Sequence, residues 1–317
     1  MEPPASPLSR TQLLRGPGGH GAHKLLYLFS GPPRPPEDMD SIGVQRNIEV
    51  ECFDLERSPE HDLLDEAMWD LLKARIIDGE FDGVFMSPPC STFSHARGLA
   101  YTGTGIRPLR GANAPDIYGF KDLTLREKEQ VKAGTLTALR AFDAAKLFHN
   151  MGRPWMIESC EFREKAPHIF ELPEGIDMRT TTAAGICDFD QCSFGAKTKK
   201  PSRIIFSKDL DFETLGRHCD HAPQWWVTPS TGRWHWGPHP QLTGKELAVS
   251  EERWDKGRQA GSPKTTYVSR AAALYTKELN EAILDVFGKY WDRPLRAPPV
   301  APSSFVGPGG KRIRSVT

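Results

Sequence analysis

The sequence predicts an α/β fold in which a mostly parallel sheet is covered by helices on both faces. Short apolar runs of strand length alternate with longer segments whose apolar residues recur every three or four positions. Alternation of strands and helices at this spacing is typical of parallel sheets. In addition, reactive or ligand-binding residue types stand at or just after the ends of four predicted strands. Ligands of such sheets bind beyond the C-terminal ends of the strands.

The first half of the chain supplies three strands and one helix. Residues 24–29 form an apolar run that ends in a Ser-Gly turn, and residues 48–53 form a second strand that ends at Asp54. Residues 62–77 carry an apolar stripe with helical spacing. Residues 83–86 form a third strand, which two prolines stop.

The second half continues the alternation. Residues 123–151 are mainly helical in pattern, and the apolar strand 154–157 follows them. Further strands are expected near 181–187 and 203–206. Apolar residues three or four apart between 268 and 290 predict a long amphipathic helix that closes the core.

The expected domain organisation is one large domain with a small lobe. Residues 23–206 and 265–293 form the large domain, and residues 207–264 form the lobe. Residues 1–22 and 294–317 are rich in Pro, Gly and Ser, which predicts disordered tails. The second tail also carries a basic cluster. This cluster is either simply solvated, or it serves as a nuclear localisation signal or contacts phosphate groups.

Bulk composition sets few limits on function. Lys plus Arg equals Asp plus Glu, 41 each, so net charge does not indicate a nucleic-acid partner and does not exclude one. The six cysteines form no CxxC pair, and no apolar run resembles a signal peptide or a membrane span. We therefore expect a monomer with reduced thiols inside the cell, nuclear or cytoplasmic, neither secreted nor bound to a membrane.

Cys90 is the first candidate for chemistry. It follows Ser87-Pro88-Pro89 directly after the third predicted strand. The two prolines fix φ and hold the thiol rigidly, and the small hydroxyl residues after it suit a loop that closes over a ligand. The alternative is a buried cysteine that only fills apolar space.

Other strand ends carry acids or a turn. Glu158 ends an apolar strand, where an unpaired carboxylate is costly. It either pairs with an arginine, lies exposed on the rim, or hydrogen-bonds a ring nitrogen of a substrate. Asp54 and Asp62 suit the ribose hydroxyls and adenine amine of a cofactor, or are a surface acid and a helix cap. Phe29-Ser30-Gly31 fits the first turn of a nucleotide site, without the usual glycine-rich run.

The order of these blocks resembles that of DNA cytosine C5 methyltransferases. The Phe-Ser-Gly turn, Asp54, the Pro-Pro-Cys loop and Glu158 follow one another as in that family, although Ser159-Cys160 replaces the usual Asn-Val after the glutamate. The chain is more similar to divergent C5-methyltransferase-like proteins of eukaryotes and their retroelements. This resemblance covers about residues 24–290 and includes the blocks at 61–64 (HDLL), 105–110 (GIRPLR), 191–195 (QCSFG) and 200–203 (KPSR).

The resemblance implies a Rossmann-like sheet that uses S-adenosylmethionine, with a small lobe like a target-recognition lobe. It implies methylation of cytosine C5 in nucleic acid, with DNA favoured over RNA. The Cys90 thiolate would add to C6 of a flipped-out cytosine, and Glu158 would stabilise protonation at N3. Arg203 would orient Glu158 or the base.

The resemblance also assigns binding residues. Those implied for S-adenosylmethionine are Phe29, Ser30, Gly31, Asp54, Asp62 and Pro88. Those implied for nucleic acid are Ser91, Ser94, Arg97, Arg107 and Arg110.

Three other functions remain open. The first is a catalytically degenerate nucleic-acid-binding protein on the same fold. The second is an amino-methyltransferase that acts on cytosine N4 or adenine N6. The latter enzymes place an aromatic residue after a Ser/Asp-Pro-Pro run and need no thiol. A Cys–His hydrolase is the third class, but no pattern ties a histidine to Cys90.

The lobe is unusual in composition. Four tryptophans fall within twelve residues, and they either stack on bases or pack within the lobe; they are Trp225, Trp226, Trp234 and Trp236. Residue types that bind zinc are also present there, but their spacing matches no familiar zinc pattern, so no metal ligand is assigned and zinc binding stays an open alternative; they are His218, Cys219, His221, His235 and His239.

Overall fold

The computed structural model describes most of the chain between the two predicted tails. The tails lie outside the described residues, apart from Ala22. Segments 245–249 and 263–267 are described by their backbone. The described residues are 22–95, 97, 107–227, 232, 234–240, 245–249, 263–267 and 274–293.

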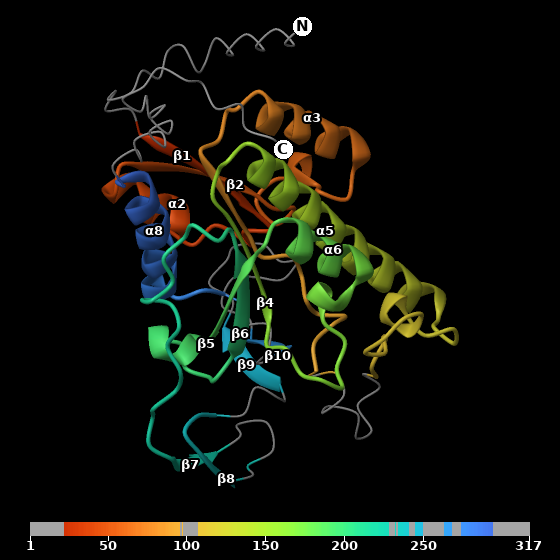
Figure 1. The fold of residues 1–317 in the computed structure, drawn as a ribbon. Coiled ribbons are helices and arrows are strands. Elements are labelled where there is room, and N and C mark those ends of the chain that lie inside the picture. The colour runs from red at the N-terminus through yellow and green to blue at the C-terminus, as the bar shows by residue number, and fades with distance from the viewer. Residues whose placement is uncertain are drawn as a thin grey trace, which may run out of the picture.

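A six-stranded sheet forms the centre of the molecule (Figure 1). Its order is β2 (Ile48–Phe53), β1 (His23–Leu28), β3 (Gly83–Met86), β4 (Trp155–Cys160), β6 (Pro201–Phe206) and β5 (Gly185–Asp190). The first four strands are parallel, whereas β6 is antiparallel to both of its neighbours. The predicted Rossmann-like, mostly parallel α/β fold is confirmed, and the reversal of β6 is the feature that the sequence pattern did not predict.

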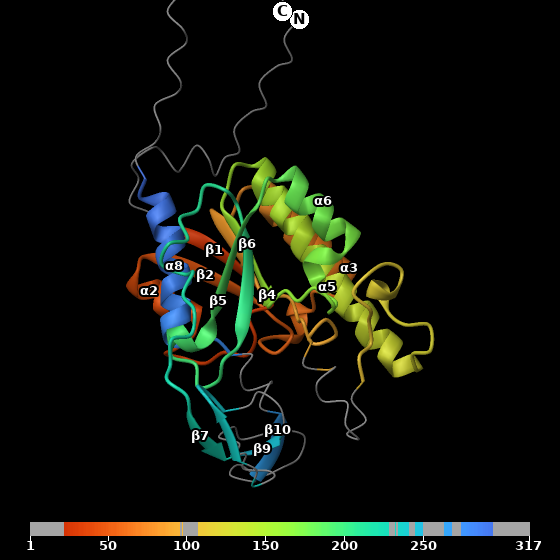
Figure 2. The same ribbon diagram turned by 60° about the horizontal axis from the view of Figure 1, so that its bottom comes forward.

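Helices cover both faces of this sheet (Figures 1 and 2). On one face lie α3 (Glu66–Ile77), α5 (Leu125–Asn150) and α6 (Pro173–Thr181), and on the other lie α2 (Met39–Gln45) and α8 (Lys277–Trp291). Side chains alternate between the faces along each strand, so β1 feeds two cores. Leu26 and Leu28 pack in the core under α5, while Leu25 and Tyr27 pack in the core under α8.

Local capping explains where the helices begin. Helix α3 starts at Glu66 instead of residue 62, because the Asp65 carboxylate accepts the Met68 N–H at 2.8 Å and so caps it. Helix α5 starts after Thr124, which forms a reciprocal capping box with Glu127. Helix α8 starts at Lys277 after the cap Thr276; the expected start near residue 268 lies outside the described residues.

Short turns connect these elements, and the sequence pattern did not separate them. The 3₁₀ turns are η1 (Pro59–His61), η2 (Asp116–Tyr118), η3 (Ile169–Glu171) and η4 (Gln191–Phe194). Residue 181, expected in a strand, ends α6, and the strand β5 begins at Gly185.

Two small antiparallel pairs lie beyond one end of the central sheet (Figure 2); they fall in the predicted lobe, except that the last strand runs three residues past its expected end at 264. They are β7 (Gln224–Val227) with β8 (Trp234–Gly237), and β9 (Lys245–Val249) with β10 (Pro263–Tyr267).

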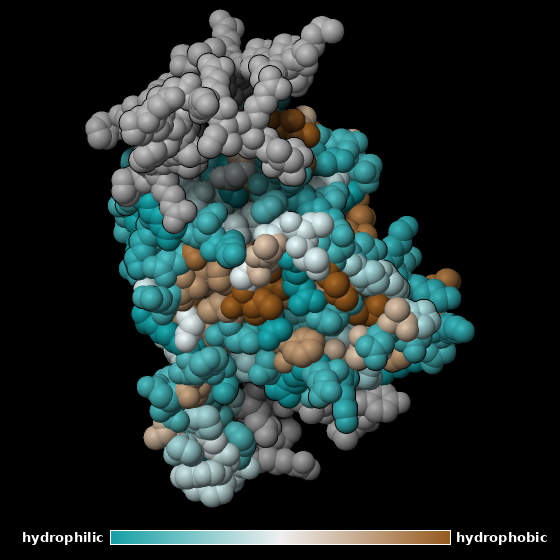
Figure 3. All heavy atoms as spheres, in the orientation of Figure 1, coloured by the Kyte–Doolittle hydropathy of each residue, from teal (hydrophilic) through white to brown (hydrophobic). Residues whose placement is uncertain are grey.

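The outer surface seen in Figure 3 is mainly hydrophilic, with a broken band of hydrophobic residues across its middle. This is the surface expected where helices enclose the two apolar cores. Within the described residues, no helix combines the length and the apolar character needed to cross a bilayer.

Candidate active site

The parallel strands bring four of the predicted site residues, Gly31, Asp54, Cys90 and Glu158, to one edge of the sheet or close to it. Strands β2, β1, β3 and β4 are parallel neighbours, so their C-terminal ends share that edge. Across it, the Gly31 N–H donates to Asp54 Oδ2 at 2.9 Å, and Ser87 Oγ donates to the Phe29 carbonyl at 2.9 Å. The strand order reverses between β1 and β3, the position at which sheets of this kind bind ligands.

Cys90 lies in the loop after β3 and is half-buried. The hydrogen bond from the Cys160 thiol, at the end of β4, lowers the pKa of Cys90 to about 7. The positive charge of Lys200 acts in the same direction, while burial and the Glu158 charge oppose it. Because the thiolate is the nucleophilic form of cysteine, these surroundings favour a reactive thiol over an inert filler.

Glu158 is only 5% exposed and lies inside β4. Gln191 Nε2 donates to its Oε1 at 3.4 Å and to Ser202 Oγ at 3.0 Å. Lys200 Nζ lies 3.8 Å from the same Oε1. The carboxyl is therefore buried but partnered, as a buried acid must be.

Arg203 does not reach Glu158. Residue 203 pairs with Ser159 and Glu158 pairs with Ile204, so Arg203 and Glu158 project from opposite faces of the sheet. The guanidinium instead makes two hydrogen bonds to Asp188, at 2.6 and 2.7 Å. The expectation that Arg203 orients Glu158 is therefore wrong. Lys200 and Gln191 contact the carboxyl instead.

The Phe-Ser-Gly turn has the backbone of a constrained binding loop. Phe29 has φ 61°, unusual for a residue with a side chain, and Gly31 has φ 71°. The Phe29 N–H is held by the Phe53 carbonyl at 2.8 Å. A Cβ built on Gly31 would meet no atom within 4 Å, so open space lies in front of this turn.

The two aspartates predicted to bind the cofactor differ in position. Asp54 directly follows β2, and its second oxygen accepts the Glu56 N–H at 2.8 Å. Asp62 follows η1, and its carboxylate accepts the Leu64 N–H at 2.9 Å, so it caps a turn instead of the helix. Pro88 is buried in the cysteine loop.

Arg110 cannot contact nucleic acid, because it is 1% exposed. Its guanidinium donates to the carbonyls of Ile117 and Val131 at 2.8 and 2.6 Å. It also donates to Thr92 Oγ1 at 3.1 Å and stacks 3.8 Å from the Phe93 ring centroid. Burial lowers its pKa to about 10. The residue anchors the cysteine loop to α5, which corrects its predicted role.

Arg107 and Arg97 lie nearer the surface. Arg107 is held in ion pairs by Asp122 and Glu127, at 2.7 and 3.0 Å. Arg97 donates to the Ser91 carbonyl at 2.9 Å and to Gln130 Oε1 at 3.3 Å. Arg97 thus holds the loop that carries Ser91, and it also donates to the Arg107 carbonyl at 3.2 Å, which ties residue 107 to the same loop.

His168 bears on the hydrolase alternative. Its Nδ1 accepts the Phe170 N–H at 3.2 Å, so Nε2 carries the proton and donates to the Cys160 carbonyl at 2.7 Å. Burial lowers the pKa of this imidazole to about 4. It positions the end of β4 and is not placed as a base for Cys90.

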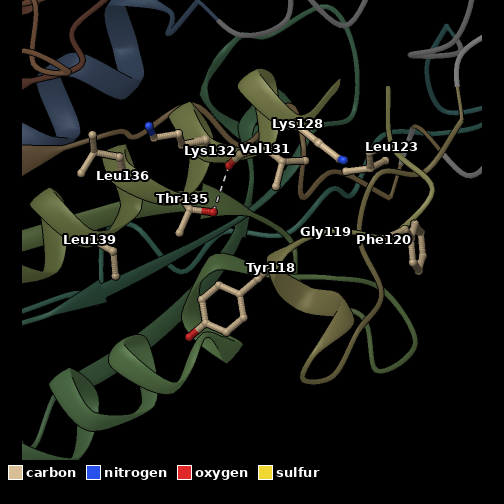
Figure 4. A pocket seen from close by; sticks show the side chains of 10 residues that line it. All are labelled: Tyr118, Gly119, Phe120, Leu123, Lys128, Val131, Lys132, Thr135, Leu136 and Leu139. Carbon is tan, nitrogen blue, oxygen red and sulfur yellow. Dashed lines mark hydrogen bonds between the residues drawn. The ribbon is translucent and has the colours of Figure 1, made fainter. Parts of the chain in front are cut away.

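A separate hollow of about 480 Å³ lies against the first half of α5 (Figure 4). Tyr118, Leu123 and Leu139 line it, together with Lys128 and Lys132. None of the predicted site residues lines this hollow, and its lining has no thiol or carboxylate.

The four tryptophans between residues 225 and 236 do not form a buried core. Trp225, Trp234 and Trp236 are 61%, 68% and 55% exposed. Only Trp226 is largely covered, and its indole donates to the Gly237 carbonyl at 2.9 Å. The interpretation that the lobe packs on its tryptophans holds in part: the rings of Trp225 and Trp236 contact each other, with centroids 5.3 Å apart, but each keeps more than half of its surface exposed.

Three residues of the site were not singled out from the sequence, namely Lys200, Gln191 and Cys160. Two of them stand inside blocks that the resemblance identifies, QCSFG and KPSR. The side chains of Lys200 and Gln191 reach Glu158 because β6 runs antiparallel to β4 and starts at the edge of the sheet where β4 ends.

Comparisons with known proteins add little. No protein-family model and no curated protein matches the chain. A crystal structure of a triple mutant of Spodoptera frugiperda DNMT2 is similar with 13% identity and a TM-score of 0.28. The match covers 64% of this chain and 56% of that chain, so the chain spans little more than half of that protein. A likeness this weak carries no argument, and the α/β fold rests on the strand order and pairing.

Proposed function

We propose that the chain methylates C5 of cytosine in nucleic acid, with S-adenosylmethionine as methyl donor and Cys90 as nucleophile. The observation that supports this most is the convergence of a thiol of lowered pKa and a buried carboxyl at one sheet edge. Cys90 lies close enough to Glu158 and Lys200 for both charges to act on its pKa. Those two residues themselves are 3.8 Å apart.

The turn at Gly31 fits the methyl donor. Open space in front of Gly31 leaves room for a ligand against the backbone. Asp54 tethers this turn through one oxygen and keeps lone pairs free for ribose hydroxyls. When bound there, S-adenosylmethionine supplies an electrophilic methyl group on a sulfonium.

The chain's residues divide the reaction into steps. The Cys90 thiolate adds to C6, and the C5–C6 double-bond electrons move toward N3. Glu158 holds a proton at N3, so negative charge does not build up on the ring. C5 then takes the methyl group, whose bond to the donor sulfur would break to leave a thioether. A base removes the C5 proton, the C6–S bond breaks to restore the Cys90 thiolate, and the N3 proton returns to Glu158. Covalent catalysis of this kind replaces one difficult step with easier ones, and general-acid assistance contributes about 10²–10⁴-fold.

Cys160 belongs to the Ser159-Cys160 pair, which departs from the Asn-Val of the family, and we assign it a role in activating Cys90. It stands where the family has the last residue of Glu-Asn-Val, and its thiol stabilises the Cys90 thiolate by a hydrogen bond. Lys200 adds a positive charge to the same thiolate. Thus the departure in sequence still supports a nucleophile at neutral pH.

The test is a covalent trap. Full-length protein is incubated with S-adenosylmethionine and either DNA or RNA that contains 5-fluorocytosine, whose C5 fluorine blocks release of the enzyme. We expect an adduct that survives denaturing electrophoresis and maps to Cys90, and none with Cys90→Ser. Absence of the adduct on both nucleic acids, with cofactor binding intact, would contradict the proposal and favour a degenerate binding protein. Methyl transfer that persists in Cys90→Ser would favour an amino-methyltransferase.

A further inference from the structure

Two cysteines and two histidines converge away from the candidate active site. Cys192 lies in η4, Cys219 and His221 lie just before β7, and His239 follows β8. One ligand atom from each side chain can be chosen so that all four lie within 4.8 Å of one another. They come from three separate segments, so local sequence proximity does not explain the cluster.

The distances fit the edges of a small tetrahedron. Cys219 Sγ lies 3.3 Å from His239 Nε2 and 3.6 Å from His221 Nδ1. Zinc–sulfur bonds of about 2.3 Å and zinc–nitrogen bonds of about 2.0 Å place neighbouring ligand atoms roughly 3.3–3.8 Å apart. The two imidazoles meet edge to face, at 71° with ring centroids 4.7 Å apart, so they approach the centre from different directions.

The surroundings orient the ligands. His239 turns Nε2 toward Cys219, while its Nδ1 lies 3.3 Å from the Lys197 carbonyl. A metal-binding histidine typically donates its second ring N–H in this way. The Cys219 N–H donates to Asp190 Oδ2 at 2.9 Å, which fixes the backbone of that ligand.

We propose that Cys192, Cys219, His221 and His239 bind one Zn²⁺ ion as a structural site. Two sulfur and two nitrogen ligands in a tetrahedral arrangement are typical of zinc. Four protein ligands leave no open position for a substrate. Cys192 and His239 are 3% and 8% exposed, whereas Cys219 is half-buried and His221 is exposed, so the site is closed by the domain on one side and borders solvent on the other.

The ion fastens the tryptophan hairpin to the central domain. The β7–β8 hairpin lies between the ligands Cys219 and His221 on one side and His239 on the other, while Cys192 follows β5, the edge strand of the central sheet. A two-stranded hairpin is marginally stable by itself, and metal binding can supply the missing free energy. The zinc site therefore positions the exposed faces of Trp225 and Trp236 relative to the sheet.

The spacing explains why the sequence alone did not reveal the site. Only Cys219 and His221 are close neighbours; His239 comes 18 residues after His221 (239 − 221), and Cys192 comes 27 residues before Cys219 (219 − 192). Two residues first grouped with the ligands do not belong to the cluster. His218 faces Asp190, with 3.8 Å between Nδ1 and Oδ2, and His235 contacts the His239 carbonyl at 3.1 Å.

The test measures metal in the full-length protein. Protein purified with zinc in the medium and without chelator should contain about one zinc per chain by elemental analysis. The variants Cys192→Ser and Cys219→Ser should retain less than about one fifth of that amount. Cys187→Ser and His218→Ala are the matched controls, because each changes a nearby residue of the same type outside the cluster, and both should keep their zinc.

A second measurement does not depend on the variants folding. Zinc is removed from the wild-type protein with a chelator and replaced with Co²⁺, which should give the visible spectrum of a tetrahedral site with thiolate charge transfer. Proteolysis within the β7–β8 hairpin should speed up on removal and slow again when zinc is restored. Less than one fifth of a zinc per chain without uptake, unchanged zinc in both cysteine variants, or a Cys192–Cys219 disulfide in the purified protein would overturn the proposal. None of these measurements depends on methyl transfer.

Discussion

Lys200 Nζ lies 3.8 Å from Glu158 Oε1, although the two residues belong to different segments of the chain. Lys200 immediately precedes β6, and Glu158 lies in β4. Both side chains are largely buried, with 17% and 6% of their area exposed, so their charges are weakly screened. The lysine acts on Glu158 and on the Cys90 thiolate together.

Replacing Lys200 should therefore impair methyl transfer. We expect Lys200→Gln to lower kcat roughly 10- to 100-fold, because a preorganised positive charge is lost beside the reacting groups. The pH profile should also move upward, since the lysine helps to lower the pKa of Cys90. Lys199→Gln is the control: Lys199 pairs with Asp190 at 3.3 Å and is 45% exposed. Equal losses in both variants would contradict this role.

The Cys160 thiol should control the reactivity of Cys90. Alkylation of Cys90 should rise with pH through a midpoint near 7, because only the thiolate reacts. In Cys160→Ala the pKa should return toward about 8.5. The thiolate fraction at pH 7 then falls about 15-fold, and greater intrinsic nucleophilicity at higher pKa reduces the net loss of rate to about 3-fold. Mass spectrometry of the Cys90 peptide measures this rate, and an unchanged midpoint would refute the link.

A methyl group on Gly31 should block the cofactor. Gly31→Ala would place a Cβ in the open space in front of the turn, at a backbone φ of +71°. Gly152 is a close control, because it has φ +65° and equally open surroundings at the turn before β4. Both substitutions should cost about 1–2 kcal/mol of stability from backbone strain. Only Gly31→Ala should weaken S-adenosylmethionine binding in a titration.

Arg110 should matter for stability and not for nucleic acid. Arg110→Met removes the donors to the Ile117 and Val131 carbonyls and leaves buried polar groups with fewer partners. We expect a loss of about 2–4 kcal/mol in the free energy of unfolding. Denaturant unfolding measures it, and a loss below about 0.5 kcal/mol, typical of surface sites, would contradict the anchoring role.

Arg97 should show the opposite pattern. Arg97→Gln should lower nucleic-acid affinity on all sequences alike and reduce the slope of log K against log salt by about 1, as expected for one lost phosphate contact. Its stability should change by less than Arg110→Met changes it. Binding measured over a range of salt concentrations decides between a phosphate contact and a purely structural arginine.

The sequence was informative where one segment determines the outcome. Apolar run lengths predicted the parallel strands, and the strand-end rule placed Gly31, Asp54 and Cys90 at one edge. The prediction that Arg110 binds nucleic acid rested on its charge and was wrong. Its hydrogen-bond partners lie 7 to 25 residues away along the chain, so a local sequence pattern does not reveal them. The contact between Glu158 and Lys200 depends on the direction of β6, which periodicity does not determine.

The reversed strand has a consequence for how the protein assembles. Strand β5 lies at the edge of the sheet, with β6 as its neighbour, and the two pair antiparallel over a short stretch of chain. Such local pairs close at a low entropic cost, so β5 and β6 can form a unit before they dock on β4. Docking is then the step that brings Lys200 and Gln191 to Glu158. The Glu158 carboxyl thus acquires its polar partners, and Cys90 the nearby charge of Lys200, only when this strand pair completes the sheet.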